Sequence, residues 1–145
     1  MKKRVGDPWM PADQYGKSLS GLSLNLLVVD IEIAVAFQTE VLGSKIIYSD
    51  PDVAILEAHG SSWMLHADHT YNEHPLSGSL RPELARGIGA EIRLHGCNPD
   101  NAEAEARKRG DTVLAGTIDK PHGLREAYLI DPDGYIWVPD IAVKS

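Results

Sequence analysis

The chain has 145 residues, enough for one domain or for two small modules that share a hydrophobic core. Its formal net charge of −7 excludes the basic surface that non-specific nucleic-acid binding requires, and no apolar run approaches the roughly 20 residues of a membrane span. The basic start lacks the apolar segment of a secretory signal, so we expect a cytoplasmic location, and the single Cys97 predicts a reduced structural thiol.

Residues 1–20 combine Pro8, Pro11 and Gly16 with polar residues and show no periodicity, which predicts an extended N-terminal arm. Trp9 and Tyr15, together with the neighbouring methionine, are large enough to dock this arm. The sequence leaves open whether they dock on the same chain or on a second subunit.

Residues 21–67 predict a first module that begins with a strand at about 23–28, where side chains alternate between two faces. Asp30 is a suitable N-cap for the following helix, and Gly43 a suitable stop. The helix carries a stripe with four-residue spacing, formed by Ile33, Phe37 and Val41. Three strands follow, at residues 45–49, 53–58 and 63–67.

Residues 68–88 form a long polar connection, which is typical of a functional loop or a linker between modules. The second module, residues 89–141, repeats the first. A strand at about 90–95 precedes a helix that is capped by Asn98 or Asp100 and ends at Arg109, before the stop at Gly110. The remaining expected elements are strands at 112–115, 125–130 and 135–138, with a loop at 117–123 and with Pro139 ending the last strand.

Each module therefore has the order strand, helix, three strands, and Gly43 and Gly110 end the two corresponding helices. Helix-surface pairs are expected between Glu103 and Arg107 and between Glu105 and Arg109, because each pair has i,i+4 spacing. A tight turn is expected at Asp131-Pro132-Asp133-Gly134, which joins the last two strands as a hairpin.

The turn at residues 131–134 precedes the aromatic Tyr135, and residues 29–43 contain Val-Asp, Ala-Phe and Val-Leu-Gly in that order. This combination resembles the vicinal oxygen chelate superfamily, which includes glyoxalase I, extradiol dioxygenases and the bleomycin- and fosfomycin-resistance proteins. The resemblance covers residues 21–139. It implies an α+β fold in which two tandem βαβββ modules form a curled mixed sheet with a concave cleft. It also implies a small-molecule ligand in that cleft and a homodimer.

Strand alternation predicts which side chains line the cleft. Those expected on the faces opposite the helices are Asn25, Glu91, Arg93 and Tyr128, and His66 joins them if its face of the fourth strand is the inner one. Such a surface is too polar for a core that has only a packing role, and it predicts a small polar or anionic ligand in the cleft. Arg93 is either a structural partner of Glu91 or an anion clamp, and the sequence leaves both roles open.

Members of the superfamily that use a metal take ligands from the first, fourth, fifth and eighth strands. In this chain the resemblance places these positions at Ser23, at or beside His66, at Glu91 and at Val138. Valine has no donor atom and serine is a poor ligand, so the expectation is no metal cofactor; a divalent ion, if one binds, would use Glu91 and His66.

Two functions follow from this surface. The first is a metal-independent binding protein of the resistance type. The second is a lyase, isomerase or dioxygenase that uses Glu91 and His66, either with a reduced metal site or as an acid and base. A purely structural interaction module is disfavoured because it would leave the polar cleft unexplained.

Overall fold

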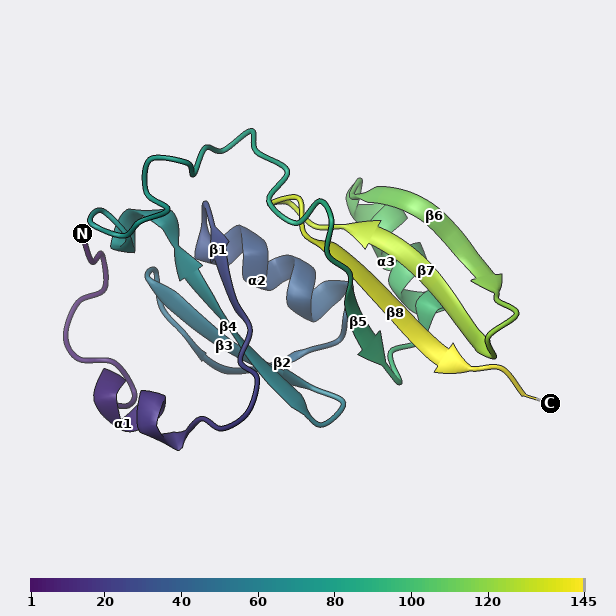
Figure 1. The fold of residues 1–145 in the computed structure, drawn as a ribbon, viewed down its shortest axis with the longest axis horizontal. Helices are drawn as coiled ribbons and strands as arrows, with labels where there is room; N and C mark the ends of the chain where they lie inside the picture. The colour runs from purple at the N-terminus through teal and green to yellow at the C-terminus, as the bar shows by residue number, and fades with distance from the viewer. Residues whose placement is uncertain (145) are drawn as a thin grey trace.

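A computed structural model describes residues 1–144 and contains two four-stranded mixed sheets, each with a helix packed on one face (Figure 1). The first module contains β1 (Asn25–Val28), α2 (Ile31–Glu40), β2 (Lys45–Ser49), β3 (Val53–Ala58) and β4 (Ser61–Ala67). These strands form sheet A in the order β1-β4-β3-β2, in which β1 and β4 are parallel.

The second module contains β5 (Ile92–His95), α3 (Pro99–Arg109), β6 (Thr112–Asp119), β7 (Leu124–Ile130) and β8 (Ile136–Ala142). These strands form sheet B in the equivalent order, β5-β8-β7-β6. The modules lie side by side, and the linker between β4 and β5 crosses above them after a short 3-10 helix, η1 (Asp68–Thr70) (Figure 1). The predicted α+β fold with two tandem βαβββ modules is therefore confirmed.

Local chemistry sets the helix ends as expected. The Asp30 side chain accepts a hydrogen bond from the Ile33 amide at 3.0 Å, and Asn98 caps α3 in the same way. Gly43 and Gly110 follow the two helices with φ of 68° and 85°, a left-handed conformation that costs glycine little.

Several predicted details are wrong. The arm is not extended throughout, because α1 (Ala12–Ser18) forms within it. β6 continues to Asp119, and two register irregularities opposite β7 absorb its extra residues. β8 continues through Pro139, since pairing with β7 resumes at Asp140.

Two predicted side-chain positions in the helices are also wrong. Ile33 is exposed, and α2 instead buries residues that include Ile31 and Val35. The expected partner of Arg109 was Glu105, but its guanidinium pairs with Asp111 and Glu40, which lie closer. The predicted pair of Glu103 and Arg107 forms at 2.8 Å.

One core joins the two modules. The rings of Trp63 and Trp137 lie 5.5 Å apart within it, and each comes from the helix-covered face of its sheet. Cys97 is buried in the same core, where burial raises the pKa of its thiol to about 11. None of the helices formed by residues 1–144 has both the length and the apolar character needed to cross a membrane.

The turn at residues 131–134 also joins the modules. Tyr135 lies after it, and its hydroxyl donates to the Leu27 carbonyl at 2.8 Å and accepts from the Leu27 amide at 3.1 Å. Asp133 accepts from the Val29 amide at 2.9 Å. These groups face away from β4, so the turn covers the free edge of β1 and protects it from pairing with another chain.

Candidate functional site

The predicted cleft residues form two separate sets, and the first lies on the open face of sheet A, opposite α2. His66 Nδ1 lies 2.6 Å from Asn25 Oδ1, and Asn25 Nδ2 donates to the Tyr71 hydroxyl at 2.9 Å. Burial lowers the pKa of His66 although Asp50 opposes the shift, so the ring is neutral at pH 7. A neutral ring that donates from Nδ1 keeps Nε2 as an acceptor.

The structure also shows which face of the fourth strand, β4, lies opposite the helix. Trp63 and Leu65 are buried in the core, whereas Met64 and His66 lie on the open face. Among residues 1–144, no hydrogen bond joins this set of predicted cleft residues to the second set, which is described next.

The second set lies on the open face of sheet B and is centred on Arg93. Its guanidinium donates to Glu91 at 2.8 Å, to Glu126, and to Asp140 at 3.4 Å. Tyr128 belongs to the same set, because nearby Glu91 and partial burial raise the pKa of its hydroxyl. The side chains of Glu126 and Asp140 are only 1% exposed. Burial raises the pKa of Glu126, but the hydrogen bond and charge of Arg93, together with the contact with His122, outweigh burial and leave the pKa below its ordinary value.

Arg93 thus donates to three carboxylates and has few N–H groups left for an anionic ligand, which favours its structural role over the anion clamp. Glu126 and Asp140 were missing from the predicted set. Asp140 lies beyond Pro139, where the strand was expected to end, whereas Glu126 had the correct alternation with Tyr128.

The positions implied for a metal do not fit a divalent ion. Ser23 is exposed with one neutral hydroxyl, Val138 is fully buried and has no donor, and His66 and Glu91 belong to different sheets. Across residues 1–144, no three or more His, Cys, Asp or Glu side chains are grouped so that they could hold a metal ion.

A cavity of about 350 Å³ lies between the N-terminal arm and the open face of sheet A. Its apolar walls include Trp9, Met10 and Tyr15 from the arm, and Ile55 and Met64 from the sheet. Its polar lining includes Lys2, Arg4, Asp52 and His66. An apolar cavity with a few polar groups is the usual form of a small-molecule site, and its volume is in the usual range.

Asp52 fastens the arm over this cavity. Its carboxylate accepts from the amides of Lys3 at 2.7 Å and Arg4 at 3.2 Å, and it lies 2.7 Å from Nε2 of His69. Burial raises the pKa of Asp52, but these three hydrogen bonds outweigh burial and hold the pKa below its ordinary value. The side chain is 3% exposed, so the fastening is shielded from solvent.

Aromatic packing holds the arm at a second point. Trp9 stacks on Tyr48 of β2, with 5.8 Å between ring centroids and 20° between planes, and the Tyr48 hydroxyl donates to Asp50 at 2.6 Å. The sequence left open whether Trp9 and Tyr15 dock the arm on its own chain or on a second subunit. In the structure they lie against their own chain, and the sequence did not identify Asp52 as the anchor.

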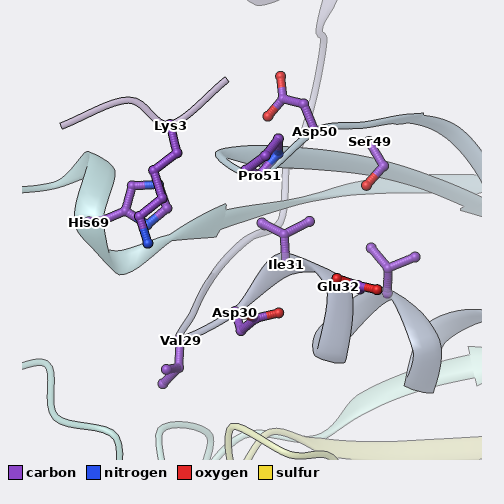
Figure 2. Close-up of a pocket in the computed structure, with 10 residues that line it drawn as sticks. Lys3, Val29, Asp30, Ile31, Glu32, Ser49, Asp50, Pro51 and His69 are labelled. Carbon is purple, nitrogen blue, oxygen red and sulfur yellow. The ribbon is translucent and has the colours of Figure 1, made fainter. Parts of the chain in front are cut away.

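A second cavity, of about 360 Å³, lies at the start of α2 (Figure 2). Figure 2 shows Lys3 and His69 together at one side of it, with Asp30 and Glu32 on the helix. Lys3 lines this cavity and Arg4 the arm cavity, as alternation along an extended segment requires. The lining of the second cavity contains no Trp, Tyr or Phe side chain, whereas the arm cavity has an aromatic wall, so the arm cavity is the better candidate site.

Comparison with solved structures identifies the same fold in many proteins. A glyoxalase/bleomycin resistance protein/dioxygenase family enzyme from Burkholderia phytofirmans PsJN is similar with a TM-score of 0.69 and 19% identity, over 83% of this chain and 97% of that one. A glyoxalase-related enzyme from Fulvimarina pelagi has a TM-score of 0.65 and 17% identity, over 85% and 88%.

A glyoxalase/bleomycin resistance protein/dioxygenase from Nocardioides has a TM-score of 0.61 and 24% identity, over 92% of this chain and 93% of that one. No protein-family model matches the sequence, and no curated protein does. The chain therefore has the glyoxalase/bleomycin resistance fold, and the resemblance to the vicinal oxygen chelate superfamily is confirmed at the level of fold.

Proposed function

We propose that this protein binds a small molecule in the arm cavity, without a metal cofactor and without converting the ligand. The observation that carries this proposal is the cavity itself, because the arm closes it with apolar walls and leaves polar groups at Arg4 and His66. Arg4 and His66 differ in this respect from Arg93, whose guanidinium already pairs with protein carboxylates. A cytoplasmic location remains a prediction.

The test is a substitution that fills the cavity with a larger side chain. Met64→Trp places a larger side chain on the cavity wall, and Ile33→Trp places the same side chain on an exposed helix position as the matched control. A library of small aromatic and polar compounds is screened by thermal shift, because a ligand that binds only the folded state raises Tm. We expect hits that stabilise the native protein and Ile33→Trp but not Met64→Trp. A library without hits, or hits that are equal in all three proteins, would refute the proposal.

The alternative function, a lyase, isomerase or dioxygenase that uses Glu91 and His66, requires both residues at one site. Within one chain they belong to separate hydrogen-bond networks on different sheets. This alternative therefore depends on a homodimer in which a module of one copy faces a module of another. Loss of turnover in Glu91→Gln with retained ligand binding would favour it over the binding protein.

We also propose that the protein forms a homodimer. The support is the exposed apolar surface of edge strand β6, where Leu114 and Ile118 are 55% and 56% exposed. Sedimentation over a range of concentrations should show a dimer that Ile118→Lys weakens, whereas Ile33→Lys, on an exposed helix position, should not. A monomer at every concentration would contradict the homodimer and leave the arm cavity as proposed.

A further inference from the structure

Arg4 differs from the other buried arginines because no hydrogen bond among residues 1–144 uses its guanidinium. Its side chain is only 14% exposed, and Nε is buried without a partner. The guanidinium forms long ion pairs with Asp52 at 3.6 Å and with Asp50 at 3.9 Å, and both distances are too long for hydrogen bonds. By contrast, the guanidinium of Arg86 donates to Asp68 at 2.7 and 2.6 Å.

Neighbouring carboxylates are already engaged by other donors. Asp52 accepts from two backbone amides and contacts His69, and Asp50 accepts from the Tyr48 hydroxyl and from the amides of residues 52 and 53. The Arg4 guanidinium therefore keeps unused N–H donors beside the cavity, and Lys2 adds a second positive charge to the same lining. Unpaired buried donors are costly, so an acceptor from a ligand would be favourable here.

The rest of the cavity suits a flat apolar body. Trp9 and Tyr15 have ring centroids 6.2 Å apart and planes tilted by 58°, and they line the cavity with Met64 on the opposite wall. Aromatic rings and a methionine thioether pack well against a planar ring. The cavity thus combines an aromatic wall with an unfilled cationic donor.

We propose that the ligand is an aromatic acid, whose ring packs against Trp9 and Met64 and whose anionic group accepts hydrogen bonds from Arg4. This inference rests on the proposed binding function and names its ligand class. Arg4 and Trp9 both belong to the arm, so the segment that closes the cavity is also the segment that selects the ligand.

Three probes that share one ring system test the ligand class: 2-naphthoate, 2-naphthalenemethanol and 2-naphthylmethylamine. Each is titrated into the whole protein at pH 7 by calorimetry. We expect 2-naphthoate to bind about tenfold or more tightly than the neutral alcohol, which is the effect of a hydrogen bond between charged groups, and the cationic amine to bind weakest.

Arg4→Gln tests the residue. The backbone amide of Arg4 also bonds Asp52, so this substitution keeps that hydrogen bond of the arm while it removes the guanidinium and its ion pairs with Asp52 and Asp50. We expect about a tenfold loss for 2-naphthoate and little change for the alcohol. Arg4→Lys, which retains the charge without the fork of donors, should fall between the two. Arg81→Gln, on the exposed linker, is the matched control.

Amide hydrogen exchange at Lys3 reports whether the arm stays docked in each variant, because that amide bonds Asp52. Equal binding of all three probes, unchanged by Arg4→Gln with the Lys3 amide protected, would overturn the aromatic-acid inference and leave the binding function intact. If no probe binds and the compound library also gives no hit, both proposals fail.

Discussion

Tyr135→Phe is the sharpest test of how the modules are held together. The Tyr135 hydroxyl makes two hydrogen bonds to the free edge of β1, one to the carbonyl and one to the amide of Leu27. The carbonyl keeps a second donor in this variant, because Arg86 Nη1 lies 2.9 Å from it. Among residues 1–144 the Leu27 amide has no other hydrogen-bond partner, and Leu27 is buried, so phenylalanine would leave an unsatisfied N–H group.

The expected cost follows from these contacts. An ordinary hydrogen bond contributes about 1 kcal/mol, and a buried donor without a partner adds about 1–3 kcal/mol, so we expect a loss of about 2–4 kcal/mol in the free energy of unfolding. For a domain of this size, each 1 kcal/mol corresponds to about 2–4 °C in Tm. Tyr135→Phe should therefore lower Tm by about 4–16 °C.

The assay is urea denaturation followed by circular dichroism, with calorimetry for Tm. Tyr15→Phe is the matched control, because no hydrogen bond among residues 1–144 uses the Tyr15 hydroxyl. If the free energies of unfolding of the two variants differ by less than about 0.5 kcal/mol, the reasoning is refuted. Such a result would mean that water hydrogen-bonds the Leu27 backbone at the edge of β1 as well as Tyr135 does.

Three further changes probe the same framework. Gly134→Ala should cost about 2 kcal/mol or more in urea denaturation, because φ is +89° and the new Cβ would lie 2.5 Å from the Cα of Ala85; an effect near zero would contradict this. Arg93→Met should cost on the order of 3 kcal/mol at pH 7, because buried Glu126 loses its arginine and keeps only the contact with His122 at 3.4 Å, with a smaller loss at pH 4, where the carboxylate protonates. Burial raises the pKa of Asp131 to about 6, whereas its unfolded value is about 3.9, so the folded state binds the proton more tightly. The free energy of unfolding should therefore fall by on the order of 2–3 kcal/mol as the pH rises from about 4 to about 6. Unfolding midpoints across this range, with Asp131→Asn as the variant that should flatten the profile, check the last prediction.

Local sequence chemistry predicted much of the fold. Asp30 and Asn98 cap helices because a short polar side chain can reach an amide three residues on, and Gly43 and Gly110 occupy left-handed positions after the helices. These features depend on neighbours in the chain. The strand ends that failed, at Asp119 and beyond Pro139, depend on pairing with distant strands, which local patterns do not encode.

The site was predictable only in part for the same reason. Alternation placed Asn25 and Glu91 on open faces, but it carries no information about how two sheets sit relative to one another. The arm had no periodicity, and its position depends on Asp52 and on the stacking of Trp9 over Tyr48. Its aromatic residues were the one signal of docking, since large apolar side chains in a polar segment seek a surface.

The arm also couples ligand binding to its own fastening. Arg4 contributes its amide to the bond with Asp52 and its guanidinium to the cavity lining. We therefore expect a ligand that binds the guanidinium as proposed to stabilise the docked arm, and the docked arm to bind that ligand more tightly. The pKa of Asp52 is lowered in the folded state, so its contribution is complete above the unfolded value of about 3.9 and is lost as pH falls through the folded pKa. We therefore expect acid to release the arm together with a ligand bound as proposed, because both depend on the same carboxylate.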